Sequence, residues 1–345
     1  MVNVVITGGA GFLGSRLARE LLAAGTLDVA GGGARPLTRV TLIDQAPVPP
    51  DLAADERVTA VRGDLVELLD PAAGGPDMLA IGGSGDKAEV IFHLAAAVSG
   101  ECEADFDLGI RANLRATEAL LASCRTLGTS PLVVFSSSLA VFGGSGDHPL
   151  PEVVDDQTLP NPQTSYGAQK VIGEQLLADY TRKGFLRGRA LRLVSVSVRP
   201  GRPNAAASGF MSGIIREPLA GQRATCPVGP DTEVALASPA KAIAGLRCAA
   251  TASDQAWGGR SAVNLPALTI SVADMAAALS RIAGPQVSAL IDWTPDPVVA
   301  RIVASWPARV RADRAARLGL TPDPDFDSII RMHLAESRSG ADSGP

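Results

Sequence analysis

Histidine and cysteine are both scarce in this chain, which has three histidines and four cysteines among 345 residues. The cysteines are widely separated, and none of them neighbours a histidine: Cys102, Cys124, Cys226 and Cys248. Metal sites built from these residue types need ligands at short, regular spacings, and disulfide-stabilised domains need a denser set of cysteines. The sequence therefore argues against a metal site and predicts reduced, mostly buried thiols.

Long hydrophobic runs and a basic stripe are also absent. No apolar stretch reaches the roughly 18 residues that a membrane span needs, and the chain starts directly with the short apolar run of residues 2–6, without a cationic leader. The 31 basic residues are dispersed among 36 acidic ones, for a formal net charge of −5, so no surface for a phosphate backbone is indicated. We predict a cytoplasmic protein that binds neither membrane nor nucleic acid.

Hydrophobic residues make up 46% of the chain, enough at this length for one large core and a smaller lobe. Over the first 200 residues, short β-branched runs alternate with helical stretches. The runs predicted as strands are residues 2–6, 40–43, 58–61, 90–94, 132–135 and 191–198. Their nearly continuous apolar character is typical of parallel strands covered on both faces. The pattern predicts an α/β fold with a doubly wound parallel sheet.

The pattern loosens after residue 200. Helical stretches at residues 209–219, 239–252 and 272–282 are separated by connections rich in proline and glycine. We predict a nucleotide-binding domain, a smaller substrate lobe with segments that cross back to the sheet, and a disordered tail, at residues 1–200, 201–336 and 337–345.

Two interruptions of the first domain are rich in glycine, alanine and proline. They cover residues 25–39 and 71–86, each between a helix and a strand. We predict that both are surface loops.

A glycine-rich turn follows the first predicted strand and opens a helix predicted over residues 13–24. Glycines at such a turn permit a tight bend, close approach of the backbone to a pyrophosphate and close packing of helix on strand, while the helix N-terminus faces the phosphates. A plain glycine-rich turn is the alternative. The predicted cofactor contacts of this turn are Gly8, Gly11, Phe12, Leu13 and Gly14.

Asp44 ends the second predicted strand, where a carboxylate accepts both ribose hydroxyls and repels a 2′-phosphate. NAD is therefore favoured over NADP. A plain surface acid is the alternative for Asp44, and Arg39 or Arg62 would weaken the preference if either turned toward the ribose. Further cofactor contacts are predicted after the third and fourth strands, at Asp64, Leu65, Leu94, Ala95 and Ala96.

Tyr166 and Lys170 stand four residues apart on a predicted helix, which places both side chains on one face. An alcohol surrenders a hydride only if its proton leaves too, and a free phenol with a pKa of ~10 is a poor base near neutral pH. We expect the Lys170 ammonium and a cationic nicotinamide to lower the pKa of Tyr166. The pair predicts hydride and proton chemistry; a tyrosine that only packs its helix is the alternative.

Three motifs together resemble the extended short-chain dehydrogenase/reductase family, which includes nucleotide-sugar epimerases and dehydratases: Gly8-x-x-Gly11-x-x-Gly14, Phe135-Ser136-Ser137-Ser138 and Tyr166-x-x-x-Lys170. The resemblance implies NAD(P)-dependent catalysis by Ser138, Tyr166 and Lys170, completed by Asn113. In this set Ser138 orients the reacting oxygen toward Tyr166. Tyr166 and Lys170 also count as cofactor contacts, because Lys170 is expected to reach the nicotinamide ribose.

The second lobe differs from that of nucleotide-sugar enzymes, whose Arg-Asp-Tyr-Ile-His-Val-like segment is missing at the comparable residues 232–239. Instead, the chain resembles the D-erythronate dehydrogenases over nearly its full length, at residues 93–96, 99–101, 199–210, 213–219 and 326–331. This resemblance implies NAD-dependent oxidation of the C2 hydroxyl of a four-carbon sugar acid to a 2-oxo acid. Residues 234–236 are aliphatic where a histidine or aromatic residue is expected, so the exact acid stays open.

The predicted substrate contacts are polar or cationic side chains near the expected nicotinamide: Ser99, Ser138, Asn204, Ser208 and Arg216. Arg216 is the nearest cation for a substrate carboxylate, although a salt-bridged helix arginine explains it as well. We expect Arg199 to anchor the end of its strand and His93 to be a satisfied core histidine.

Three functions stay open on the sequence alone. The first is an NAD-dependent dehydrogenase of a small sugar acid, and the second is a nucleotide-sugar epimerase or dehydratase, or a uronate dehydrogenase, on the same fold. The third is an NAD-sensing binding protein, which would be expected to lack Tyr166 and Lys170. The predicted partner is a small sugar acid. A homodimer is one assembly that the sequence leaves open.

Overall fold

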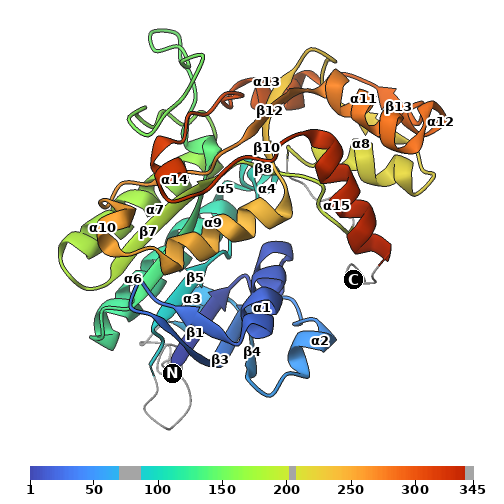
Figure 1. Ribbon diagram of the computed structural model, residues 1–345. Coiled ribbons are helices and arrows are strands. Elements are labelled where there is room, and N and C mark those ends of the chain that lie inside the picture. The colour runs from blue at the N-terminus through green and yellow to red at the C-terminus, as the bar shows by residue number, and fades with distance from the viewer. Residues whose placement is uncertain (70–86, 202–206, 339–345) are drawn as a thin grey trace.

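The computed structural model describes residues 1–69, 87–201 and 207–338. A mostly parallel sheet forms the centre of the molecule, and helices lie on both of its faces (Figure 1). A smaller lobe, coloured yellow to red, is built mainly from residues after 207 and sits at one end of the sheet (Figure 1).

Eight strands of the described residues form the main sheet, in the order β11-β7-β6-β5-β1-β3-β2, with β4 also paired to β3. They are β1 (Val2–Thr7), β2 (Thr26–Asp28), β3 (Ala34–Asp44), β4 (Val58–Arg62), β5 (Val90–His93), β6 (Leu132–Ser138), β7 (Arg187–Leu193) and β11 (Val263–Asn264). Except for the antiparallel pair β2 and β3, neighbouring strands run parallel. The direction of winding changes between β1 and β5, and this is where an open α/β sheet forms its ligand crevice.

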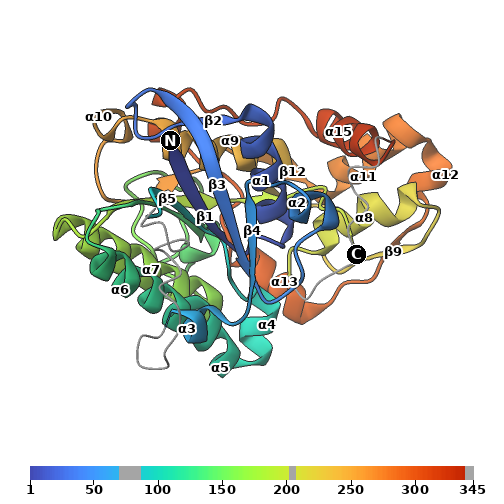
Figure 2. The same ribbon diagram turned by 90° about the horizontal axis from the view of Figure 1, so that it is seen from below.

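Helices cover both faces of the sheet because successive side chains of each strand point to opposite sides. Val4 packs in a core with Leu17 of α1, whereas Val5 packs in a second core with Leu120 of α6. Figure 2 shows α1 and α9 on one side of the strands and α3, α6 and α7 on the other. The helices of this part are α1 (Phe12–Ala24), α2 (Pro50–Ala53), α3 (Leu65–Leu68), α4 (Ser99–Ala104), α5 (Phe106–Gly109), α6 (Ala116–Leu127), α7 (Ser165–Arg182), α9 (Pro239–Thr251) and α10 (Asp254–Trp257).

The smaller lobe has its own core, which includes Phe210, Ile214, Met275 and Ile330. Two small sheets contribute to it, β12-β10-β8 and β13-β9. Its strands are β8 (Ser195–Val196), β9 (Ala224–Cys226), β10 (Glu233–Ala237), β12 (Leu268–Ser271) and β13 (Ile291–Trp293). Its helices are α8 (Phe210–Leu219), α11 (Val272–Ala283), α12 (Pro285–Ser288), α13 (Pro297–Ala304) and α15 (Phe326–Arg338), whereas α14 (Asp313–Arg317) packs against β11 of the main sheet.

The fold differs from the sequence-based expectation at two places in the sheet. Residues 25–39 are not a plain loop, because β2 and the start of β3 form a hairpin whose Leu27 and Leu37 are buried. The strand predicted over residues 191–198 begins earlier, at Arg187, and ends at Leu193; β8 then pairs with β10 of the other lobe. The first residues of β7 include Arg187 and Arg189, so an apolar run does not mark where this strand begins.

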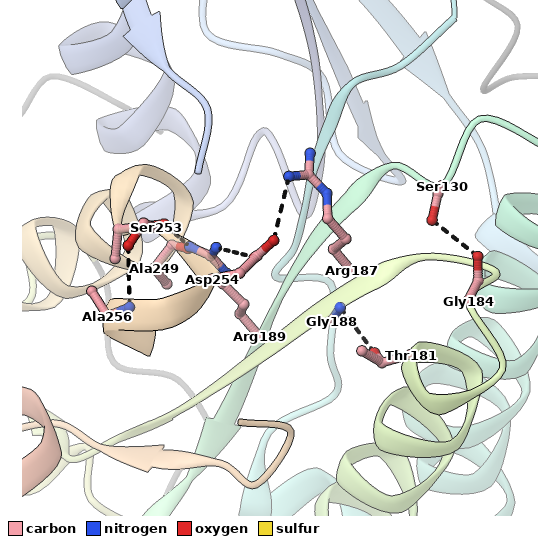
Figure 3. Close-up of polar contacts among 11 residues, drawn as sticks. Ser130, Thr181, Gly184, Arg187, Gly188, Arg189, Ala249, Ser253, Asp254 and Ala256 are labelled. Carbon is pink, nitrogen blue, oxygen red and sulfur yellow. Dashed lines mark hydrogen bonds and ion pairs between the residues drawn. The ribbon is translucent and has the colours of Figure 1, made fainter. Parts of the chain in front are cut away.

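Arg189 explains how a charged residue can sit within this buried strand. Its side chain is 2% exposed and donates to the carbonyl oxygens of Ala249 at 2.7 Å and Ala252 at 2.6 Å, at the C-terminus of α9. It also pairs with Asp254 at 2.7 Å, as Figure 3 shows. These contacts satisfy both the cation and the free carbonyl groups at the helix end, so they fix α9 against the sheet.

Helix α15 continues to Arg338, so residues 337 and 338 of the predicted tail are helical. Residues 339–345 and the predicted loop at 71–86 lie outside the described residues. Within the described part of the chain, none of the helices has the length and apolar character that crossing a membrane requires.

Candidate active site

A cavity of about 710 Å³ lies at the carboxyl ends of the central strands, between the sheet and the smaller lobe. This volume is in the usual range for a pocket that encloses a cofactor and a small substrate. Of the residues predicted from the sequence, those that line it are Gly8, Gly11, Phe12, Leu13, Gly14, Asp44, Asp64, Leu65, Leu94, Ala95, Ala96, Ser99, Ser138, Tyr166, Lys170, Ser208 and Arg216. Asn113 does not line it, and Asn204 lies outside the described residues.

The glycine turn brings three backbone segments close together. Gly8 has φ +71°, and a Cβ at this position would lie 2.8 Å from the backbone nitrogen of Ala95. A Cβ on Gly14 would lie 2.0 Å from the carbonyl oxygen of Gly8. Larger residues would therefore push α1 away from β1 and close the groove that a pyrophosphate occupies in such folds.

Asp44 stands at the end of β3, beside this turn. Its Oδ2 accepts a hydrogen bond from the Ala10 backbone N–H and its Oδ1 accepts one from the Ala46 backbone N–H, each at 3.0 Å. A carboxylate has about four acceptor sites, so capacity for two ribose hydroxyls is left. The carboxylate is thus held in place by the backbone, whatever its ligand.

The two arginines that could weaken NAD selectivity differ in their position. Arg39 lies five residues before Asp44 on β3, or about 16 Å along an extended strand, so it cannot reach the same ribose. Arg62 is the register partner of Asp44 on β4, and its Nε donates to the Gln45 carbonyl oxygen at 2.9 Å. Arg62 is therefore the one of the two that lies next to the site.

Asp64 and Leu65 stand where β4 leads into α3. Asp64 caps this helix by accepting from the Val66 N–H at 2.8 Å, and it also accepts from Nε of Arg111 at 2.9 Å. These bonds fix the loop that carries the predicted cofactor contacts Asp64 and Leu65.

Tyr166 and Lys170 lie in the first turns of α7, which Thr164 caps by accepting from the Gly167 N–H at 3.1 Å. Lys170 Nζ donates to the Ser136 carbonyl oxygen at 2.9 Å and lies 5.5 Å from the centroid of the Tyr166 ring. The Ser138 hydroxyl, at the end of β6, hydrogen-bonds with Tyr166. Three of the four predicted catalytic side chains therefore meet at one place in the cavity.

The pKa values at this place differ from the expectation. Burial raises the pKa of Tyr166 to about 12, and only the Ser138 hydrogen bond and the charge of Arg199 act to lower it. Lys170 was expected to lower this pKa and does not; burial lowers its own pKa to about 8. The protein's own groups thus favour a neutral phenol, and the cationic ring of bound NAD would add the charge that helps Tyr166 to ionise.

Asn113 lies in a π-helical turn, Ile110–Arg115, that leads into α6. Its Oδ1 accepts from the Ala97 N–H at 2.8 Å, and its Nδ2 donates to the side-chain oxygen of Gln169 at 2.7 Å. Ala97 lines the cavity, and Gln169 precedes Lys170 on α7. These contacts make Asn113 a positioning residue that ties the cavity wall to the catalytic helix.

His93 belongs to a directed chain of hydrogen bonds behind the same wall. Thr117 donates its only hydroxyl hydrogen to the Asn113 carbonyl oxygen at 2.6 Å, so at 3.0 Å it must accept from Nε2 of His93. His93 Nδ1 then accepts from Thr7, whose oxygen accepts from the Ala95 N–H at 3.3 Å. The histidine is neutral, because burial and the charge of Lys170 lower its pKa to about 3.

The substrate side of the cavity contains two arginines with different partners. Arg216 Nη1 donates to the Arg199 carbonyl oxygen at 2.7 Å, and its Nη2 pairs with Glu217 at 2.6 Å. Arg216 is thus a salt-bridged helix arginine that also lines the cavity. Arg199 was expected only to anchor its strand, yet its side chain lines the cavity and interacts electrostatically with Tyr166.

Sequence reasoning also missed Trp306, which lines the cavity with Val303 and Pro307. These residues come from α13 and the segment after it, far from every motif in the sequence. The signal for Arg199 was present: a cation at the end of a strand segment, followed by Pro200 and Gly201. A cation at the carboxyl edge of such a sheet lies where ligands bind.

A family model matches residues 4–235 of this chain, and its description is NAD dependent epimerase/dehydratase family. The chain belongs to this family. The predictions of an extended short-chain dehydrogenase/reductase, of its doubly wound fold and of NAD as the cofactor are thereby confirmed.

Two related proteins of this family match the chain over nearly its whole length. D-erythronate dehydrogenase of Cupriavidus necator is 49% identical over 97% of this chain and 99% of its own. D-erythronate dehydrogenase of Haemophilus influenzae is 38% identical over 96% and 99% of the two chains.

Solved structures agree on the fold. A crystal structure described as the nucleoside-diphosphate-sugar epimerase of Agrobacterium tumefaciens has a TM-score of 0.85 and 38% identity, over 98% of this chain and 95% of its own. The L-threonine dehydrogenase of Clostridium difficile has a TM-score of 0.81 at 21% identity, over 99% of both chains, which bears on the fold alone.

Proposed function

We propose that this chain is an NAD-dependent dehydrogenase that oxidises the C2 hydroxyl of a small sugar acid, with D-erythronate as the first candidate. The observation that carries the proposal is the full-length match to two D-erythronate dehydrogenases at 49% and 38% identity. The cavity supports it, because Ser138, Tyr166 and Lys170 converge next to the cationic side chain of Arg199.

In this reaction the alcohol loses one hydride and one proton and becomes a ketone. Bound NAD supplies the hydride acceptor and a cationic ring beside the substrate. Gly8, Gly14 and Asp44 would hold the pyrophosphate and a ribose, since they border the groove at the start of α1.

The protein's own groups handle the proton. Tyr166 accepts the hydroxyl proton of the substrate, and Ser138 holds the reacting oxygen by a hydrogen bond while the charge builds up on the phenol. Lys170, fixed by the Ser136 carbonyl oxygen, keeps a positive charge within 5.5 Å of the Tyr166 ring. The charge of Arg199 and the cationic ring of bound NAD favour the phenolate.

An epimerase of nucleotide sugars is the second candidate, because the similar Agrobacterium tumefaciens structure carries that description. An epimerase returns the hydride to its substrate, so no NADH accumulates. A uronate dehydrogenase would release NADH but oxidise the anomeric carbon. An NAD-sensing protein would bind the cofactor and turn over none of these substrates.

A screen of substrates separates these candidates. Purified protein is incubated with NAD and, in turn, D-erythronate, other C4 to C6 aldonic acids, uronic acids and UDP-glucose, and NADH is followed by absorbance. We expect NADH with D-erythronate and a 2-oxo acid as the product. NADH with uronic acids alone, or conversion of UDP-glucose without NADH, would reject the proposal.

We also propose a homodimer, supported by apolar side chains on two neighbouring helices. Phe106 of α5 is 62% exposed and Ile172 of α7 is 42% exposed, and these helices contact each other. Burying such side chains between two copies is favourable. Light scattering should give twice the mass of the chain, and Phe106→Glu with Ile172→Glu should give the monomer; a wild-type monomer would reject this part.

A further inference from the structure

Arg199 carries a charge that the described residues do not neutralise. Its guanidinium forms none of the ion pairs found among them, and its one side-chain hydrogen bond there is a long contact of 3.5 Å to the Ser208 hydroxyl. Arg216, by contrast, is neutralised by Glu217. A half-buried guanidinium with so few partners has most of its five donors left for another molecule.

The carboxylates that line the cavity are engaged elsewhere. Asp44 binds the backbone at the glycine turn, and Asp64 pairs with Arg111. Glu101 accepts from the Val98 N–H at 2.9 Å, and Glu233 pairs with Arg309 at 3.0 Å. The negative charges are therefore engaged by backbone N–H groups or by arginines outside the cavity, whereas the end that holds Tyr166 contains the cations Lys170 and Arg199.

The backbone of Arg199 is fixed from two sides. Its N–H donates to the Ser212 hydroxyl at 3.0 Å, and its carbonyl oxygen accepts from Arg216 at 2.7 Å. Both partners lie on α8, so this helix sets where the guanidinium can go. Burial and, after it, the charge of Arg216 lower the pKa of Arg199, which an anion bound at Arg199 would reverse.

We infer that Arg199 binds the carboxylate of the substrate and thereby restricts the site to acids whose carboxylate is bonded directly to the carbon that is oxidised. The inference rests on the proposed dehydrogenase function and adds the residue that selects a 2-hydroxy acid. Its geometric basis is that Arg199 lines the same cavity as Ser138 and Tyr166, with its Nη2 3.5 Å from the hydroxyl of Ser208, another lining residue. An arginine fork holds a carboxylate through two parallel hydrogen bonds, so the neighbouring C2 hydroxyl would be held beside Tyr166.

The test compares an acid with its uncharged analogue. Steady-state kcat/KM is measured with NAD for D-erythronate and D-erythronamide, in the wild-type protein, in Arg199→Gln and in Arg182→Gln. Arg182 is a matched control, because it is an exposed arginine near the end of α7 that pairs with Asp179. For Arg199→Gln we expect a loss of about 100-fold with the acid, mostly through KM, and less than about threefold with the amide. The control should change neither.

Equal losses with acid and amide would mean that Arg199 supports the fold or the phenol, and the inference would be overturned. Unchanged kinetics with the acid would overturn it as well. Arg199→Lys guards against a folding defect, because it keeps the charge and loses the fork, and we expect it to lie between wild type and Arg199→Gln. The pH profile with the amide gives a further readout: Arg199 lowers the pKa of Tyr166, so its removal should move the rising limb of the profile to higher pH.

Calorimetry separates this inference from the proposed function. Binding of D-erythronate and of D-lactate is measured in the presence of NADH, where no oxidation can occur. If the wild-type protein binds both acids through Arg199 but does not oxidise D-erythronate with NAD, the proposed function fails and the carboxylate site stands. If it oxidises D-erythronate and Arg199→Gln binds the acid as well as wild type does, the carboxylate site fails. If the wild-type protein binds neither acid, both fail.

Discussion

Strand β7 and the segment that follows it both contain arginines with little exposure to solvent, yet the two regions use them differently. On β7, Arg189 donates to the end of α9, and Arg192 donates to both carboxylate oxygens of Glu174 at 2.8 and 2.7 Å. Arg199, seven residues after Arg192, has no such partner among the described residues. Burial alone does not distinguish a structural arginine from one that binds a ligand; the partners of the guanidinium do.

The same contrast holds between side chains that face the cavity and side chains that are buried behind the residues lining it. Behind these lining residues, Glu174 and Arg192 form one satisfied network with Ser137, and His93 and Thr117 form another with Thr7, while Ser137 and Thr7 themselves border the cavity. In front, Ser138, Tyr166 and Arg199 have bonding capacity left. We therefore expect changes in front to affect catalysis and binding, and changes behind to affect stability.

Among the residues that face the cavity, Tyr166→Phe is expected to have the largest effect on turnover. Removing the hydroxyl takes away the proposed base and leaves the ring to pack, so turnover should fall by a factor of about 10² or more. Binding of NAD, measured by fluorescence titration, and the unfolding midpoint should stay near wild type. Wild-type turnover would show that another group accepts the proton.

The largest effect behind the wall is expected from Glu174→Gln. Glu174 and Arg192 are 4% and 6% exposed, and breaking such a pair leaves a buried charge without its partner. The free energy of unfolding in urea should fall by about 3–5 kcal/mol. Arg199→Gln serves as the comparison and should lose less than about 1 kcal/mol. If Arg199→Gln lost as much stability as Glu174→Gln, the distinction between Arg192 as a structural arginine and Arg199 as a ligand-binding one would be wrong.

Asp44 combines the two kinds of position, because its carboxylate binds the backbone and also faces the cavity. Asp44→Ala should relax an NAD preference that we expect to be at least ~10-fold over NADP, about 1.4 kcal/mol. Values of kcat/KM for the two cofactors test this. Equal efficiency of the wild-type protein with NAD and NADP would remove the argument from Asp44. The double variant Asp44→Ala with Arg62→Ala would then show whether Arg62 accepts the 2′-phosphate.

The effect that is smallest near neutral pH concerns the pH dependence of stability. The pKa of His93 is about 3 in the folded protein and about 6.5 when unfolded, so only the unfolded chain takes up this proton between these values. The contribution of neutral His93 is fully present above pH 6.5 and is lost as the pH falls toward 3, at about 1.4 kcal/mol per pH unit once the pH is well below 6.5. His93→Gln should flatten the curve of unfolding free energy against pH by that slope. Parallel curves would mean that His93 is protonated in the fold.

Local spacing explains what the sequence made predictable. The glycine turn and the step from Tyr166 to Lys170 are each set within a few residues of one element, so their placement follows from the periods of strand and helix. The roles of Arg199 and Arg216 were harder to predict, because they depend on whether a carboxylate of the protein lies nearby in space. Arg216 has such a partner in Glu217. Asn113 was expected to complete the catalytic set, and its side chain binds Ala97 and Gln169, partners that spacing alone does not reveal.

Transfer of deuterium from D-erythronate labelled at C2 tests the central claim most directly. The account places the carboxylate at Arg199 and the neighbouring C2 hydroxyl at Tyr166, so the C2 label should appear in the reduced cofactor, one deuterium for each 2-oxo acid formed. Acid labelled at C3 should give unlabelled NADH. Label arriving from C3, or label that stays in the sugar acid while no reduced cofactor forms, would contradict the account.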